Sequence, residues 1–170
     1  MPASMHTFSV GSFTRALTQL NAILEKAQAH VEAKKIDPAA LLDARLYPDM
    51  FPLAEQIRRC ADGAVTATNL LAGNEAPARG EPKERTIPEL IVRVKNAIAA
   101  VEAFKPSQID GVEEKPIVMK TPRGDMKFVG LGFLQHFALP NFYFHVTTAY
   151  DILRHNGLEI GKMDYLGKVG

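Results

Sequence analysis

Cysteine is almost absent from this sequence, as are long apolar runs and any excess of one charge. The 170 residues include one cysteine, Cys60, so no disulfide can form within the chain, which suits a reducing compartment. The 20 Lys and Arg residues against 19 Asp and Glu residues give no basic surface for nucleic acid or for an anionic membrane. No window reaches the roughly 20 consecutive apolar residues that a membrane span requires. The first residues lack a basic flank followed by an apolar run, so we expect no signal peptide and a cytoplasmic protein.

What the sequence does contain is the period of amphipathic helices, in four segments. These segments are residues 8–35, 49–74, 86–104 and 130–157. Thr86 and Glu89 have the spacing of a helix capping box, and Gly157 is placed to end the last helix in the left-handed conformation. The stretch PIVMKTPRGDMKFVG, residues 116–130, has two β-forming runs around a Pro-Gly turn and predicts a hairpin. The sequence therefore predicts an all-α fold, a four-helix bundle in one domain spanning residues 1–170, with a small β-hairpin before the last helix.

Two polar residues fall on the apolar side of the second predicted helix. At about 100° per residue, Asp49 and Gln56 lie two turns apart on the same side as the apolar stripe. That stripe consists of Leu53, Ile57, Cys60, Ala64, Ala67 and Leu71. We therefore expect both polar side chains to be buried near the start of this helix.

The fourth predicted helix, in the stretch LPNFYFHVTTAYDILRHNG, also places polar residues on its apolar side. Asn141 and His145 are one turn apart and share the face of Phe142, Ala149 and Ile152. Pro140 lies within this helix and removes one backbone donor. The same face of the helix thus carries an amide and an imidazole toward the core.

Burying these four side chains is unfavourable unless they bond to each other, to water or to an ion. If the two helices face each other, Asp49, Gln56, Asn141 and His145 converge. His145 and Asp49 are suitable ligands for a divalent metal such as zinc or nickel, with Asn141 as a weaker ligand. The same cluster could instead line a small-molecule pocket, or satisfy itself and fix the helix register. Asp49 could also serve only as a helix N-cap.

The motifs PDMFPLAEQI, LPNFYFHVTTAYDILRHNG and GKMDYLG resemble an uncharacterised bacterial family within the DinB/YfiT-like metalloenzyme superfamily. The resemblance covers nearly the whole chain and implies an up-down-down-up four-helix bundle, frequently dimeric. Members of the superfamily typically hold a divalent metal with one histidine from the second helix and an H-x-x-x-H pair from the fourth. Carried over to this chain, the pair falls on Asn141 and His145, and Asp49 or Gln56 takes the place of the histidine from the second helix. One of the three histidines is present.

Three functions are compatible with these observations. The first is a binding module that takes a small molecule at Asp49, Gln56, Asn141 and His145. The second is a metal-dependent enzyme, a thiol transferase or a hydrolase, in which His145 and Asp49 hold the metal. The third is a structural dimer without a ligand, for which the outward-facing Tyr143 and Tyr150 would supply the contact. A homodimer is expected in any case, with no nucleic-acid partner and no membrane partner.

Overall fold

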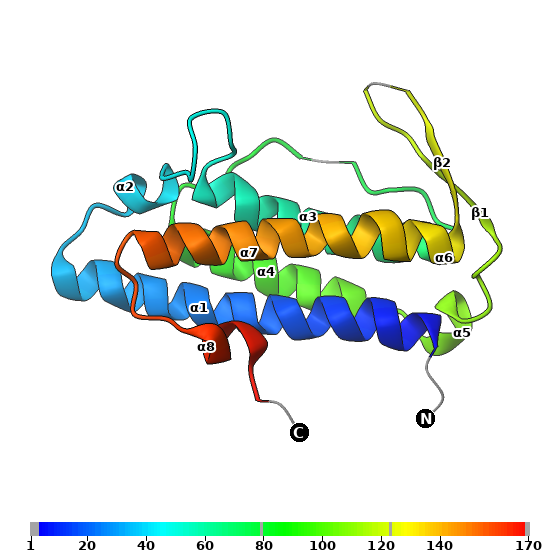
Figure 1. Ribbon diagram of the computed structural model, residues 1–170, viewed down its shortest axis with the longest axis horizontal. Coiled ribbons are helices and arrows are strands. Elements are labelled where there is room, and N and C mark those ends of the chain that lie inside the picture. The colour runs from blue at the N-terminus through cyan, green and yellow to red at the C-terminus, as the bar shows by residue number, and fades with distance from the viewer. Residues whose placement is uncertain (1–3, 79, 123, 169–170) are drawn as a thin grey trace.

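The computed structural model describes residues 4–78, 80–122 and 124–168, and it is mostly helical (Figure 1). The helices are α1 (Ser12–Lys34), α2 (Pro38–Leu42), α3 (Leu53–Leu71), α4 (Ile87–Glu102), α5 (Pro106–Ile109), α6 (Gly130–Phe133), α7 (Leu139–His155) and α8 (Lys162–Leu166). Two π-helical turns, η1 (Thr7–Gly11) and η2 (Leu134–Ala138), precede α1 and α7. The strands β1 (Pro116–Met119) and β2 (Met126–Val129) form an antiparallel pair with Ile117 opposite Phe128.

The long helices α1, α3, α4 and α7 form the predicted bundle in up-down-down-up order. Figure 1 shows that α3 and α4 run in the same direction, because the segments 72–78 and 80–86 return along the length of the bundle between them. The helix α3 packs against both α4 and α7, and α1 packs mainly against α4. The predicted hairpin is confirmed and stands at the end of the bundle where α7 begins; Arg123 in its turn lies outside the described residues.

The helix ends follow from local side-chain chemistry. The Thr86 hydroxyl accepts a hydrogen bond from the Glu89 N–H at 3.3 Å, and the Glu89 carboxylate accepts one from the Thr86 N–H at 3.0 Å. This reciprocal pair is the predicted capping box and starts α4. Gly157, with φ of 90°, ends α7 in the left-handed region, as predicted.

The start of the second long helix differs from the prediction. The helix α3 begins at Leu53, not near Asp49, with Pro52 as its extended N-cap. Pro48 directly precedes Asp49, and Pro52 directly follows Phe51. A residue that precedes a proline, as Phe51 does, is biased away from the helical conformation, so the helix does not extend back from Pro52 to Asp49. The predicted position of Asp49 on the buried stripe is therefore wrong, and its side chain is exposed in the turn before α3.

The last helix is continuous from Gly130 to His155, with the widened turn η2 directly before Pro140. The Leu139 N–H donates to the Leu134 carbonyl, the longer bond of a π turn, and Pro140 follows with no N–H to place. Gly130 starts this run where a Cβ atom would overlap the Val112 carbonyl oxygen, so only glycine fits there. The helix therefore begins in close contact with the backbone of Val112 and Glu113, which precede the hairpin.

The C-terminal segment forms the short helix α8, which lies against α1 (Figure 1). The Tyr165 hydroxyl bonds to the Thr147 hydroxyl at 2.9 Å, and the Tyr165 ring meets Tyr150 edge-on at 5.8 Å between centroids. The outward side of Tyr150 is therefore covered by this chain's own tail. Among the described residues, no helix combines the length and apolarity needed to cross a membrane.

Candidate functional site

A buried polar pair joins α3 to α7. The Gln56 Oε1 atom lies 2.7 Å from the His145 Nδ1 atom, and the two side chains are 1% and 7% exposed. Both residues lie where the helical period predicted them, on facing sides of the second and fourth long helices. Their mutual hydrogen bond offsets the free energy that burying either polar group alone would cost.

The direction of this bond follows from a second contact. The Gln56 Nε2 atom donates to the Phe51 carbonyl oxygen at 3.1 Å, and a carbonyl can only accept. The amide oxygen of Gln56 therefore faces His145, whose Nδ1 donates to it. In the neutral imidazole the lone pair then lies on Nε2.

The two other predicted site residues lie differently. Asn141 shares a side of α7 with His145, as predicted, but it is exposed and not buried, because that side faces an open cleft at this level. Asp49 is exposed in the turn before α3 and is not among the described residues that line the cleft. The structure thus brings together Gln56 and His145, places Asn141 one turn away, and leaves Asp49 apart.

The cleft beside His145 has a volume of about 840 Å³. Its floor is the side of α3 that carries Arg59, Gly63 and Thr66. Its walls are the segment 73–77, the hairpin segment 118–122, and residues of α6, η2 and α7. Since α3 and α7 are antiparallel, the cleft has a polar end at Arg59 and His145 and an apolar end at Leu70 and Phe137.

Arg59 is the residue of this cleft that sequence reasoning missed. Its Nε atom donates to the Glu55 carboxylate at 2.8 Å, and its guanidinium carbon lies 4.4 Å from the centre of the Phe51 ring. These two contacts hold the guanidinium in one orientation. The signal was present, because Arg59 follows Gln56 by three residues and so neighbours it on the helix surface.

Gly63 also shapes the cleft. It lies in the middle of α3, where glycine is less favourable than alanine by about 0.8–1 kcal/mol. A Cβ atom added there would meet nothing within 4 Å, and the residue does not have a positive φ. The backbone therefore does not require glycine at this position, and the missing side chain leaves the cleft floor open.

The side chains present do not fit the metal site that the resemblance implies. Within the described parts of the chain, no three His, Cys, Asp or Glu residues are grouped so that they could hold a metal ion. The cleft offers the single imidazole of His145, and the Gln56 oxygen is bonded to that same ring. Asp49, expected as a metal ligand, is directed elsewhere.

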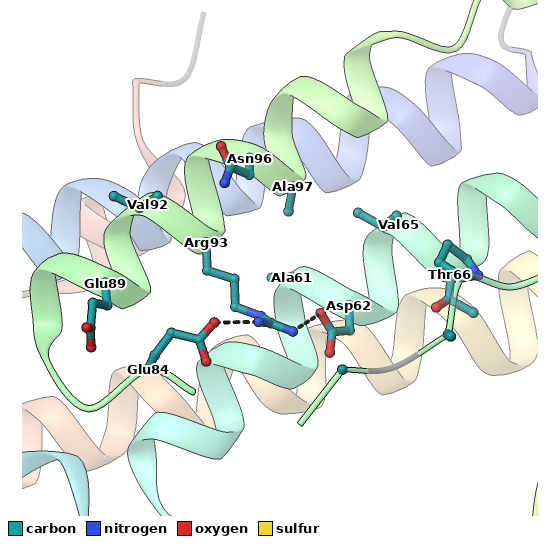
Figure 2. Close-up of a pocket in the computed structure, with 13 residues that line it drawn as sticks. Ala61, Asp62, Val65, Thr66, Glu84, Glu89, Val92, Arg93, Asn96 and Ala97 are labelled. Carbon is teal, nitrogen blue, oxygen red and sulfur yellow. Dashed lines mark hydrogen bonds and ion pairs between the residues drawn. The ribbon is translucent and has the colours of Figure 1, made fainter. Parts of the chain in front are cut away.

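A second polar cluster joins α3 to α4, and all its charges are paired (Figure 2). Figure 2 shows the Arg93 guanidinium between Glu84 and Asp62. Its terminal nitrogens lie 2.5 Å from a Glu84 oxygen and 2.6 Å from an Asp62 oxygen. Arg58, buried at 8% exposure, donates to the Glu84 carboxylate at 3.1 Å and to the Glu84 backbone carbonyl at 2.8 Å. A smaller cavity of about 360 Å³ lies beside this cluster, lined in part by Val92 and Asn96.

The pKa values in the charged cluster reflect this pairing. Burial raises the pKa of Glu84, but hydrogen bonds from its own backbone and from Arg93 and Arg58 outweigh burial and lower the pKa overall. Burial lowers the pKa of Arg93, but hydrogen bonds to Glu84 and Asp62 outweigh that effect and raise it. Both groups therefore stay charged near neutral pH and pin the end of the segment 72–86 to α3 and α4.

Cys60 is the only cysteine and lies fully buried in α3. Burial raises the pKa of its thiol far above the ordinary value. Because the thiolate is the nucleophilic form, the thiol is a core side chain and not a reactive group.

Comparison with known proteins agrees with this fold. Residues 5–166 match the family described as "Domain of unknown function (DUF1993)". The chain belongs to the DUF1993 family. No curated protein matches this DUF1993 chain.

The DUF1993 chain is similar to a solved structure, the crystal structure of a DinB family member protein from Shewanella denitrificans at 1.83 Å resolution. The two share 38% sequence identity and superpose with a TM-score of 0.87, over 96% of this chain and 92% of that chain. The expected resemblance to the DinB group, and the bundle fold that it implies, are thereby confirmed.

Proposed function

We propose that the cleft between α3 and α7 binds a small organic molecule, which contacts His145 and Asn141. The observation that carries this proposal is the buried Gln56–His145 pair at the wall of a large cleft. The cleft volume of about 840 Å³ is within the range of small-molecule sites, and apolar walls with a few fixed polar groups are typical of them. A pair that served only helix register would need no cleft beside it.

The proposal is tested by a thermal-shift screen with a library of organic acids, alcohols and amines. Gly63→Leu fills the cleft floor without overlapping the backbone, since an added Cβ meets nothing within 4 Å. Gly11→Leu is the matched control, because Gly11 is exposed, equally uncrowded and outside the cleft. We expect compounds that raise the melting temperature of the wild type and of Gly11→Leu but not that of Gly63→Leu. If no compound does so, the cleft is not a binding site.

The alternative function is a metal-dependent thiol transferase or hydrolase, as the resemblance implies. The single imidazole in the cleft supports it less well than it supports ligand binding, since three ligands are usual at a catalytic metal. We expect protein purified without chelator or tag to take up no stoichiometric zinc, nickel or manganese. One metal per chain that is lost in His145→Ala would favour the enzyme instead.

A homodimer is the second part of the proposal. Tyr143 and Phe144 are neighbours on α7 and are 37% and 55% exposed, so they offer an apolar surface to a partner. Sedimentation velocity should show a dimer that Phe144→Ser weakens. A wild type that is monomeric at every accessible concentration would contradict this.

A further inference from the structure

We propose that the molecule in the cleft is an amphipathic organic acid, whose carboxylate pairs with the Arg59 guanidinium while its apolar part lies against Phe137. This inference rests on the proposed function and deepens it by naming the chemical class of the ligand. Four features of the cleft support it.

The first feature is that Arg59, unlike its neighbour Arg58, has N–H donors that no hydrogen bond within the described ranges engages. Arg58 engages all three of its nitrogens, with Glu55 and Glu84. Arg59 uses its Nε atom for Glu55, and no hydrogen bond within the described ranges engages its two terminal nitrogens. Those terminal N–H groups form a planar fork, which suits a carboxylate.

The second feature is that the guanidinium is already oriented. Its Nε is tied to Glu55 and its face rests on Phe51, and its side chain is 30% exposed. A ligand that pairs with it therefore loses little additional side-chain freedom on binding. Glu55 is shared with Arg58, so its charge is divided between two guanidinium groups.

The third feature is the space beside Arg59. Gly63 follows Arg59 by one helical turn, and nothing lies within 4 Å of the place where its Cβ would be. The room for a ligand group is thus one helical turn from Arg59, on the floor of the same cleft.

The fourth feature is the change of character along the cleft. Lys120 adds a second cation to the lining, where Glu75 is the one carboxylate among the described lining residues. Leu70 is the eleventh residue after Arg59, which is about 16 Å along a helix. At the Leu70 end, Phe133 and Phe137 stack with ring centroids 6.0 Å apart, and both line the cleft. A molecule with an anionic head and an apolar body matches this polarity from one end to the other.

The test uses three probes of one shape and different charge: 4-phenylbutyrate, 4-phenylbutanol and 4-phenylbutylamine. Isothermal titration of the wild-type chain should give an affinity for the acid at least about tenfold above that for the alcohol, with the amine weakest. Arg59→Gln should remove the preference for the acid, so that the acid and the alcohol bind with similar affinity. Arg59→Lys should keep part of the preference, because it keeps the charge and loses the fork. Arg154→Gln, an exposed arginine at the far end of α7, is the control and should change nothing.

The outcomes separate the two proposals. Equal or tighter binding of the alcohol or the amine would overturn the inference and leave the cleft as a binding site. Unchanged acid affinity in Arg59→Gln would also overturn it, because the carboxylate would then lie elsewhere. If none of the three probes binds, the inference is wrong, and the library screen with Gly63→Leu decides separately whether the cleft binds any other molecule.

Discussion

The helix α3 carries polar clusters on two of its sides, and they differ in kind. Toward α4, Arg58, Arg93, Glu84 and Asp62 form a chain of ion pairs in which every charge has a partner. Toward α7, the neutral pair of Gln56 and His145 lies at the wall of a cleft about twice the volume of the cavity beside the ion pairs. The ion pairs hold elements in place, whereas the neutral pair lies at an open cleft beside Arg59, whose two terminal nitrogens are engaged by no hydrogen bond within the described ranges. We therefore propose a structural role for the first side and ligand binding for the second.

The largest expected effect comes from breaking this network of ion pairs. Arg58→Met should lower the free energy of unfolding by about 3 kcal/mol, because it leaves the largely buried Glu84 carboxylate short of a partner. The neighbouring Arg59→Met is the matched control and should lower it by less than about 1 kcal/mol, since Arg59 is more exposed. Urea unfolding at pH 7 measures both. Equal losses would mean that the two arginines do not differ as the structure implies.

The pH dependence of the free energy of unfolding tests whether the charge of Glu84 stabilises this network. The pKa of Glu84 is lowered from 4.5, so its ionised form stabilises the folded state above that pH, and the contribution is lost as pH falls below it. Glu84→Gln should therefore be about 2 kcal/mol less stable than the wild type at pH 7, with the gap closing as pH falls toward 3. Unfolding curves at several pH values would show this. A gap that is constant with pH would show that the carboxylate charge is not what matters.

The neutral pair should contribute less to stability. Gln56→Leu and His145→Ala should each lower the free energy of unfolding by about 1–2 kcal/mol, because each leaves the other group without this bond. The double variant should lose less than the sum of the two, since both changes remove the same interaction. Strict additivity in the four-protein cycle would mean that the two side chains do not interact in solution.

The smallest expected effect is an increase in stability. Gly63→Ala should raise the free energy of unfolding by about 0.5–1 kcal/mol, because alanine suits a helix interior and its Cβ meets no atom. Gly130→Ala is the opposite control and should destabilise strongly, since its Cβ would overlap the Val112 carbonyl. Thermal melts compare the two. A loss of stability in Gly63→Ala would show that the cleft floor is not open.

The long helices, the caps at Thr86 and Gly157, and the facing positions of Gln56 and His145 were predicted from the sequence, because all of these follow from periodicity and local chemistry. Asp49 was misplaced, since the helical period was extended across Pro48 and Pro52 when prolines at that spacing favour turns. The ion pairs were not predicted, because Arg58 and Arg93 meet partners 26 and 31 residues away in sequence.

A pocket at Gln56, Asn141 and His145 was among the alternatives that the sequence left open, but the walls of the cleft could not be predicted. Its walls come from the segment 73–77 and from the hairpin, and their positions over α3 depend on long-range packing and not on any local period. The angular position of a residue predicts the side of the helix on which it lies. It does not predict whether that side is buried in the core or faces an open cleft. Asn141 shows this, because its side was predicted correctly and its burial was not.

The central claim is that α3 binds a ligand on its α7 side and not on its α4 side. The most direct measurement is a map of backbone amide chemical shifts in the labelled protein during titration with 4-phenylbutyrate and with the strongest compound from the library screen. The account predicts that the perturbed amides include Gly63, Asn141 and His145. Perturbations confined to Val92, Arg93 and Asn96, around the smaller cavity of Figure 2, would contradict it and place binding on the opposite side of the helix.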